Sequence, residues 1–264
     1  MTANWENFEW ACTEYLNIRF GYYAEFIHQG GSDSTVPDIL AISKNGTEFY
    51  LEAKLSPAQC GQFVLLPETT TQTFKYSNRN KSNVNKYSAA IMEHMNKHFE
   101  KYKEAGTRGE NINMINGTEI FAGWVMQTYR DKGVKFIITN DYTLFPLENF
   151  RKYFNVTATY RIKRSGSRDV GKKLMKNVVS FIKTRDYGIT SCQMDDNKLL
   201  IHSSAKLDNQ RFTLGEYEYM FAKRNELYEV RKLSNTYNAN VIFSIELKPN
   251  AVGITDEEFI AHLA

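Results

Sequence analysis

Cysteine is scarce in this chain, and the three that occur are scattered. Cys12, Cys60 and Cys192 are odd in number and lack the short spacings of a zinc site, so neither a disulfide framework nor a structural zinc is expected. This pattern is typical of a reducing compartment, and we expect a cytoplasmic protein. No apolar run reaches the roughly 18 residues that a membrane helix needs. The N-terminus lacks the basic and apolar regions of a signal peptide.

The chain also lacks a strong excess of charge of either sign. Its 33 Lys and Arg and 30 Asp and Glu leave a net charge of +3, which permits a nucleic-acid partner without arguing for one. No glycine-rich phosphate loop is present, and no Ser-His-Asp or Cys-His arrangement can be identified. Apolar and aromatic residues, in contrast, are abundant, at 42% and 14%. Over 264 residues, this composition predicts a globular protein of one or two domains with its own core.

Hydrophobic periodicity predicts a mixture of helices and strands, an α/β (α+β) fold. Helices are expected over residues 5–27, 83–104, 118–132, 147–154 and 170–184, and after Thr255, which opens a capping box. Strands are expected over residues 38–43, 47–55, 63–66, 134–139, 156–163 and 241–247. The first two strands flank Asn45-Gly46, a hairpin signal, so a β-ribbon is predicted directly after the first helix.

The most informative stretch is Pro37-Asp38, followed after thirteen residues by Glu52-Ala53-Lys54. This is the PD-(D/E)xK pattern of nucleases. Phosphodiester cleavage needs a divalent cation to neutralise the phosphate and to lower the pKa of the attacking water, and Mg²⁺ prefers oxygen ligands. Asp38, Glu52 and the Ala53 carbonyl would be those ligands. Lys54 would place its positively charged ammonium group beside the water and the phosphate. The alternative is a pair of charged residues on the wet face of an ordinary hairpin.

The length of the hairpin loop decides whether this site can form. A two-residue loop at Asn45-Gly46 would pair Asp38 with Ala53 and turn Asp38 away from Glu52. A three-residue loop with Gly46 in the left-handed conformation would pair Asp38 with Glu52 on one face. We therefore predict an odd-length loop or a bulge here.

Other polar residues close to this stretch could complete the site. Glu9, Glu14 and Glu25 lie in the predicted first helix, where one of them could reach the cation or orient a water molecule. A solvated helix face is the alternative for each. Gln62, with its neighbour Gln59, could touch the DNA backbone, and ordinary loop hydrogen bonding is the alternative.

A basic segment at residues 160–168 holds four basic side chains in nine residues. Arg can donate two hydrogen bonds to guanine, Ser can contact several base edges, and Gly lets the backbone approach closely. A strand leading into such a turn could enter the major groove. The candidate DNA contacts are Arg161, Lys163, Arg164, Ser165, Ser167 and Arg168. The alternative is a hairpin tip that meets water or only phosphates.

Six ordered blocks of this sequence resemble the type II restriction endonucleases. They are residues 31–40 (GSDSTVPDIL), 52–54 (EAK), 59–65 (QCGQFVL), 134–139 (VKFIIT), 154–168 (FNVTATYRIKRSGSR) and 233–245 (LSNTYNANVIFSI). Blocks of this length are specific, unlike the three-residue nuclease motif. The resemblance maps the catalytic set onto Asp38, Glu52 and Lys54. Asn240, within the last block, is a further candidate for DNA contact.

The resemblance implies a restriction-endonuclease-like mixed β-sheet core with flanking helices, a recognition sheet and an inserted small α+β DNA-contacting module. We assign residues 1–145 to the catalytic domain and residues 146–168 with 235–264 to sequence recognition. Residues 169–234 would be the inserted module. From Arg168 to Ser234 the chain carries 13 basic residues against 9 acidic ones. We therefore expect Lys172, Lys173 and Lys176 to make phosphate contacts that position the DNA without specifying its sequence.

The activity that the resemblance implies is Mg²⁺-dependent cleavage of double-stranded DNA at a short palindrome, GCGC, leaving 3′ overhangs and 5′-phosphate ends. Mn²⁺ is an expected substitute, and Ca²⁺ is expected to support binding without cleavage. No organic cofactor or membrane is expected. The resemblance also implies a monomer that nicks the strands in turn and a cognate DNA methyltransferase in the same restriction-modification system. The alternatives are a structure- or repair-specific nuclease of the same superfamily, or a catalytically inactive DNA-binding module.

Overall fold

The computed structural model describes residues 4–30, 36–164 and 166–264. The chain divides into two compact units. The main unit comprises Met1–Arg161 and Ala239–Ala264, and the inserted unit comprises Ile162–Asn238. None of the helices in the described ranges combines the length and the apolar character needed to cross a membrane. The assignment of separate catalytic, recognition and accessory roles stays a prediction.

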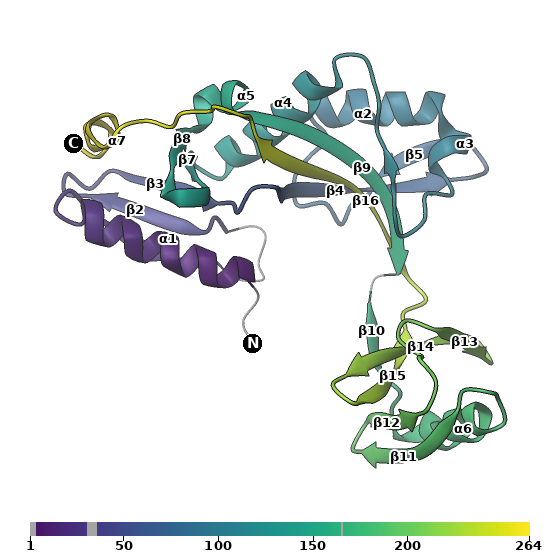
Figure 1. The fold of residues 1–264 in the computed structure, drawn as a ribbon. Coiled ribbons are helices and arrows are strands. Elements are labelled where there is room, and N and C mark those ends of the chain that lie inside the picture. The colour runs from purple at the N-terminus through teal and green to yellow at the C-terminus, as the bar shows by residue number, and fades with distance from the viewer. Residues whose placement is uncertain (1–3, 31–35, 165) are drawn as a thin grey trace. The chain divides into compact units, whose positions relative to one another are not determined.

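The first sheet of the main unit carries the predicted nuclease motif. Its strand order is β1-β2-β3-β7-β8, and only the β3–β7 pairing is parallel. The strands are β1 (Ala24–His28), β2 (Ile39–Ser43), β3 (Glu48–Ala53), β7 (Val134–Ile138) and β8 (Leu144–Pro146). Helices α1 (Asn4–Phe20) and α7 (Asp256–Leu263) pack against this sheet (Figure 1).

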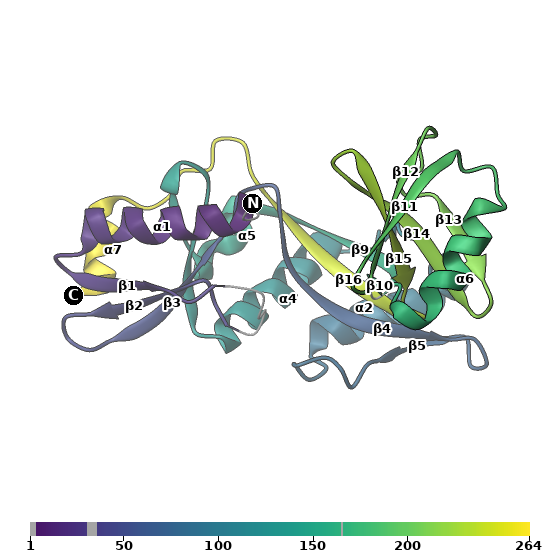
Figure 2. The same ribbon diagram turned by 90° about the horizontal axis from the view of Figure 1, so that it is seen from below.

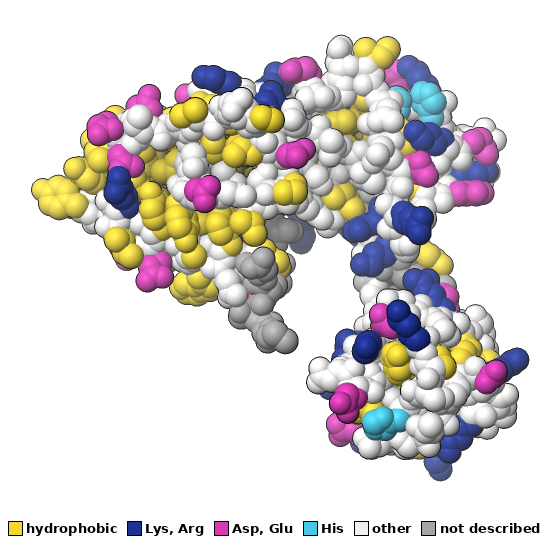
Figure 3. All heavy atoms as spheres, viewed as in Figure 1, with side chains coloured by type: hydrophobic (Ala, Val, Ile, Leu, Met, Phe, Trp, Pro, Cys, Tyr) yellow, Lys and Arg dark blue, Asp and Glu magenta, His cyan; other side chains and the backbone are white. Residues whose placement is uncertain are grey.

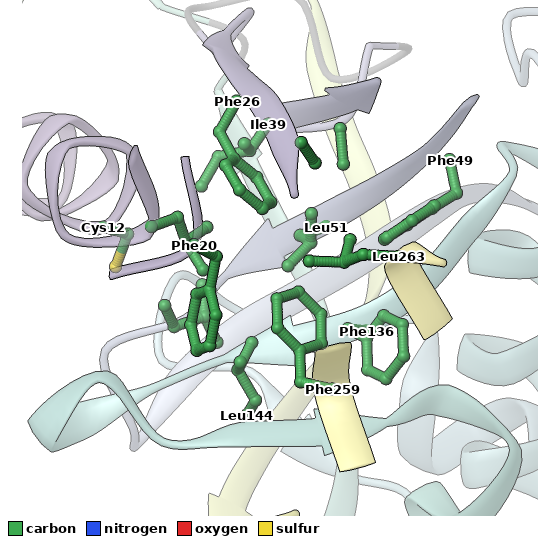
Figure 4. Close-up of a cluster of buried hydrophobic side chains, with 14 of the residues drawn as sticks. Cys12, Phe20, Phe26, Ile39, Phe49, Leu51, Phe136, Leu144, Phe259 and Leu263 are labelled. Atoms are coloured by element: carbon green, nitrogen blue, oxygen red, sulfur yellow. The ribbon is translucent and has the colours of Figure 1, made fainter. Parts of the chain in front are cut away.

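The core of this sheet joins both ends of the chain. Cys12 and Phe20 of α1 and Phe259 of α7 are buried in one cluster with strand residues such as Leu51 and Phe136 (Figure 4). The Phe20 and Phe259 rings meet edge to face with centroids 4.9 Å apart, a geometry that adds to the gain from burial. The core therefore fixes α1 over the strands that carry the motif.

The predicted first helix is too long. It ends at Phe20 rather than at residue 27, and residues 24–28 form β1. The residues of β1 alternate between buried and exposed, which is the period of a strand. The Asn17 side chain donates to the Phe26 carbonyl (2.7 Å) and accepts from the Phe26 amide (3.1 Å). These two bonds hold the chain as it folds back along its own helix.

The predicted odd-length hairpin loop is confirmed. Ile39 pairs with Leu51 and Ile42 pairs with Glu48, so the loop consists of three residues. Gly46 has φ +83°, and its amide donates to the Ser43 carbonyl at 2.9 Å. Because the register continues beyond Ile39, Asp38 lies opposite Glu52 at the end of the ribbon.

The second sheet of the main unit has the order β5-β4-β16-β9-β6. Its strands are β4 (Ala58–Glu68), β5 (Thr73–Tyr76), β6 (Glu110–Asn111), β9 (Phe154–Arg164) and β16 (Tyr237–Leu247). The strands predicted at residues 156–163 and 241–247 correspond to β9 and β16, which are neighbours in this sheet. Helix α4 (Gly117–Asp131) stacks Trp124 on Phe243 of β16, with ring centroids 4.3 Å apart.

The remaining helices of the main unit are α2 (Lys86–Lys97), α3 (Phe99–Tyr102), α4 (Gly117–Asp131), α5 (Phe150–Tyr153) and two 3₁₀ turns (Asn140–Tyr142 and Leu147–Asn149). The predicted helix at residues 83–104 is therefore two helices. The chain turns at His98, where φ −123° and ψ 38° depart from helical values. The predicted capping box at Thr255 is present, since the Thr255 hydroxyl accepts from the Glu258 amide at 3.2 Å.

The inserted unit is a small α+β fold with its own core. Its sheet has the order β11-β12-β15-β14-β13, and β10 pairs with β15. The strands are β10 (Ser167–Asp169), β11 (Ile189–Asp195), β12 (Lys198–Ser203), β13 (Arg211–Leu214), β14 (Tyr217–Arg224) and β15 (Leu227–Leu233). Helix α6 (Lys172–Lys183) lies beside this sheet (Figure 2) and buries Val178 and Ile182 against strand residues such as Val230.

Replacing Gly46 with Ala tests the hairpin geometry. A Cβ at this position meets no atom within 4 Å, so the expected cost is that of the left-handed backbone, about 1 kcal/mol of unfolding free energy. Gly106→Ala is the matched control, because its Cβ also meets no atom and its φ is not in the left-handed region. Urea denaturation of the two variants measures the difference. Equal unfolding free energies would contradict the assigned turn.

Candidate active site

The two strands of the hairpin bring the predicted catalytic residues together. Asp38 lies directly before β2, Glu52 lies near the end of β3, and Lys54 directly follows β3. Residues that lie opposite each other on antiparallel strands share a face of the sheet, so the register places the Asp38 and Glu52 side chains side by side. The Asp38 carboxylate is held there by the Ala53 amide, which donates to Oδ2 at 2.9 Å. Both carboxylates are buried, at 8% and 4% exposure.

The Lys54 ammonium marks the point where the oxygen atoms converge. Its Nζ lies 2.6 Å from Glu52 Oε2 and 3.0 Å from Asp38 Oδ2. It also donates to the Ala53 carbonyl at 3.1 Å. All three oxygen donors predicted for a cation therefore surround one positive charge. The backbone is anchored at the same place, because the Lys54 amide donates to the Ile138 carbonyl of β7 at 2.9 Å.

Glu9 of α1 is a third buried carboxyl group facing this site. Burial and, to a smaller extent, the nearby charge of Asp38 together raise the pKa of Glu9 to about 7, although the Lys54 charge opposes the shift. Burial also raises the pKa of Glu52 to about 7, although the Lys54 charge opposes the shift. For Lys54, burial lowers the pKa, but the Glu52 and Asp38 charges outweigh it and hold the pKa above its ordinary value. One ammonium thus faces three carboxyl groups, and the site has an excess of negative charge at neutral pH.

His28, at the end of β1, is a site neighbour that the sequence analysis missed. Its Nε2 lies 3.4 Å from Glu9 Oε2, and both side chains are more than nine-tenths buried. The Trp10 ring stacks on the imidazole with centroids 4.1 Å apart. Gly30 lies against both partners, and a Cβ there would collide with Glu9 Oε2. A lone histidine at an unpredicted strand gave no sequence signal for this contact.

The donor set fits a hard divalent cation. Carboxylate and carbonyl oxygens are the ligands that Mg²⁺ and similar ions prefer, and an ammonium already lies among them. Within residues 4–30, 36–164 and 166–264, no group of three His, Cys, Asp or Glu side chains is arranged to hold a metal. The Ala53 carbonyl is the third oxygen beside the Lys54 ammonium, next to the two carboxylates.

Two of the predicted DNA contacts meet on the second sheet. The Asn240 amide donates to Gln62 Oε1 at 3.3 Å, and the Gln59 amide approaches the same oxygen at 3.4 Å. Gln62 is exposed, whereas Asn240 is 8% exposed. Among the described residues, Asn240 Oδ1 is buried without a hydrogen-bond partner. A buried polar atom of this kind is costly unless a ligand or water satisfies it.

The other predicted contacts lie on β9 and β10. Tyr160 of β9 is buried, and strand alternation places Arg161 and Lys163 on the opposite face. In β10, the Ser167 hydroxyl accepts from Arg231 Nε at 3.3 Å, and Arg168 pairs with Lys232. Ser165 and the Arg164 side chain lie outside the described residues.

Two of the acidic candidates face solvent, and one of the predicted phosphate-contacting lysines is paired with an acidic side chain. Glu14 and Glu25 are exposed, in agreement with the solvent-facing alternative. Lys172 forms an ion pair with Asp196 at 2.7 Å in the inserted unit. Of the three upstream carboxylates, only Glu9 is therefore buried beside the motif.

The raised pKa of Glu9 predicts how stability depends on pH. A carboxyl group whose pKa is higher in the folded chain favours folding while it is protonated, so its contribution is lost as the pH rises through about 7. Glu9→Gln should therefore lose less unfolding free energy between about pH 5 and about pH 8 than the parent protein. Glu14→Gln, on the exposed side of the same helix, should keep the parent slope. Urea denaturation at both pH values measures this, and parallel curves for Glu9→Gln and the parent would contradict it.

Comparison with known proteins gives one informative result. No protein-family model matches the chain, and no curated protein does. A solved structure of HhaI endonuclease in complex with DNA matches with a TM-score of 0.74 and 38% sequence identity, over 99% of both chains. This identity over the whole length shows common descent as well as a common mixed α+β fold. The chain therefore belongs to the type II restriction endonucleases, the DNA-cleaving hydrolases that include HhaI endonuclease.

Proposed function

We propose that this endonuclease hydrolyses duplex DNA by the PD-(D/E)xK mechanism with Mg²⁺, using one active site built from Asp38, Glu52 and Lys54. The observation that carries the proposal is the convergence of Asp38 Oδ2, Glu52 Oε2 and the Ala53 carbonyl on one cationic atom, at 2.6–3.1 Å. No other chemistry identified in the sequence explains three buried carboxyl groups around a single ammonium. A restriction endonuclease needs a divalent metal in general, and the oxygen donor set favours Mg²⁺, with Mn²⁺ as a substitute.

The roles of the residues follow from their chemistry. A bound divalent cation supplies charge neutralisation for the scissile phosphate and lowers the pKa of the attacking water. Asp38, Glu52 and the Ala53 carbonyl would hold that cation. Lys54 would then direct its ammonium to the water and the phosphate, where it stabilises the charge that develops in the transition state. Glu9 would face the same site from α1 as a further acidic group.

Specificity is proposed for the second sheet and the basic segment. Asn240 has an unsatisfied buried oxygen beside Gln62, which favours a bound polar partner there. Arg161 and Lys163 lie on the face of β9 opposite its buried residues, and Arg residues suit guanine in the major groove. By similarity to HhaI endonuclease, we propose GCGC as the site, with 3′ overhangs and 5′-phosphate products. Ser165, Ser167, Arg164 and Arg168 complete the proposed DNA-contacting set.

The setting proposed for the enzyme also follows from the family. We propose a cytoplasmic monomer that nicks the two strands in turn, with a cognate DNA methyltransferase that protects the host DNA. A structure of HhaI endonuclease in complex with DNA is known, and DNA is the proposed partner here.

Digestion of a mapped plasmid with Mg²⁺, followed by sequencing of the ends, tests the recognition site and the overhang together. Cleavage confined to DNA junctions or lesions would indicate a structure- or repair-specific nuclease instead.

Replacing Lys54 with Ala tests the catalytic assignment. Loss of a charge that stabilises the transition state should lower the cleavage rate by roughly 100-fold or more. Sequence-specific binding in Ca²⁺ should be retained, because both carboxylates remain. Lys44→Ala, in the exposed loop of the same hairpin, is the matched control and should cleave normally. Cleavage by Lys54→Ala at the parent rate would remove Lys54 from the mechanism.

A further inference from the structure

A cavity lies within the inserted unit. It has a volume of about 360 Å³ and is lined by residues 166–168, Tyr217 and residues 232–235. All of these residues belong to the inserted unit, whose visible surface carries many Lys and Arg side chains (Figure 3). The cavity is large enough for a tetrahedral anion with its water.

Two positive charges lie opposite each other at this cavity. Arg168 of β10 and Lys232 of β15 are directly paired in the antiparallel register, and Tyr219 of β14 is paired with Lys232 from the other side. Directly paired residues share a face of the sheet, and like charges in this arrangement destabilise it. The pairing therefore costs folding free energy unless an anion lies between the two side chains.

Lys232 is buried without an acidic partner. It is 5% exposed, and its ammonium lies 3.6 Å from the centre of the Tyr217 ring. Among the described residues, no carboxylate lies within ion-pair distance of Lys232. Burial lowers the pKa of Lys232, and the Arg168 charge lowers it further. Lysine is rarely buried this far without a counter-charge.

On the opposite face of the same strands, charged side chains with a structural role are neutralised by ion pairs within the inserted unit. Arg231, next to Lys232, forms ion pairs with Asp169 and with Glu229, the latter at 2.6 Å. Arg224 pairs with the second oxygen of Glu229 at 2.8 Å. Two arginines thus face two carboxylates. The face that lines the cavity carries two cations, Arg168 and Lys232, without carboxylates among the described residues that balance their charge.

We propose that this cavity binds a phosphate group of the DNA backbone between Lys232 and Arg168. The assignment to DNA rests on the proposed function, while the anion site itself rests on the paired cations and the cavity. Its occupant neutralises the like-charge pair, so binding stabilises the inserted unit. Contacts to phosphate position a protein on DNA but carry no sequence information directly. Arg168 therefore contacts the backbone rather than a base edge, which is the alternative left open for the basic segment in the sequence analysis.

The first test uses inorganic phosphate on the full chain. At constant ionic strength, replacing chloride with phosphate should raise the melting temperature of the parent protein and leave Lys232→Met unchanged. Without phosphate, Lys232→Met should melt at a higher temperature than the parent, because the like-charge pair is gone.

A second variant, Arg168→Ala, replaces an exposed residue and should also lose the response to phosphate. It covers the case in which Lys232→Met fails to fold. Lys223→Met, exposed and outside the cavity lining, should respond like the parent. An equal rise in all four proteins, or no rise in the parent protein, would overturn the site.

The second test identifies the source of the phosphate. Binding to duplex DNA is measured in Ca²⁺ over a range of salt concentrations. Loss of one phosphate contact lowers the slope of log affinity against log salt by about 0.9, so Lys232→Met should show this decrease with any DNA sequence and keep the parent's site preference. An unchanged slope with an intact phosphate response would overturn the DNA assignment. A parent protein that cleaves no DNA contradicts the proposed function. The inorganic-phosphate test of the anion site does not depend on that result.

Discussion

The ion pairing of Lys54 with Asp38 and Glu52 is the interaction on which the rest of the main unit depends. Removing charges from water is costly, and a buried carboxylate without a counter-charge destabilises a fold. The three-residue loop sets the register that puts Asp38 opposite Glu52, and the β7 pairing fixes Lys54. The amides of Gln29 and Gly30 donate to the Asp38 carbonyl at 2.8 and 3.0 Å, which ties the end of β1 to the same place. The hairpin, the parallel strand and α1 thus all hold one cluster of charges.

The molecule treats buried charge in two ways. Around Arg231, cations and anions balance within the inserted unit, and the network serves the fold. Around Lys54 the balance is negative, and around Lys232 it is positive. Each imbalance costs stability in the free protein, and an ion of opposite charge recovers that cost on binding. The ion that would fit the negative site around Lys54 is a divalent cation, and the ion that would fit the positive site around Lys232 is a phosphodiester. A DNA-cleaving enzyme encounters both when it binds its substrate.

Local chemistry explains what the sequence could predict. Asn45-Gly46 allowed a three-residue turn, and alternation then placed Asp38 and Glu52 on one face. The end of the first helix could not be predicted, because the bonds that start β1 come from Asn17 folding back on Phe26. Glu9 and His28 are 19 residues apart and meet only once that reversal is known. The Arg168–Lys232 pair depends on a register between β10 and β15 that no local pattern encodes.

Crystals of the protein soaked with Mn²⁺ test most directly whether Asp38 and Glu52 together hold a divalent cation. Anomalous scattering locates the ion. We expect a peak within bonding distance of oxygens of Asp38 and Glu52 and of the Ala53 carbonyl, since hard divalent cations prefer oxygen ligands. The Lys54 ammonium should have moved off that point. A peak elsewhere in the main unit, or an ion bound by only one of the two carboxylates while Lys54 still bridges them, would show that Asp38 and Glu52 do not form the metal site.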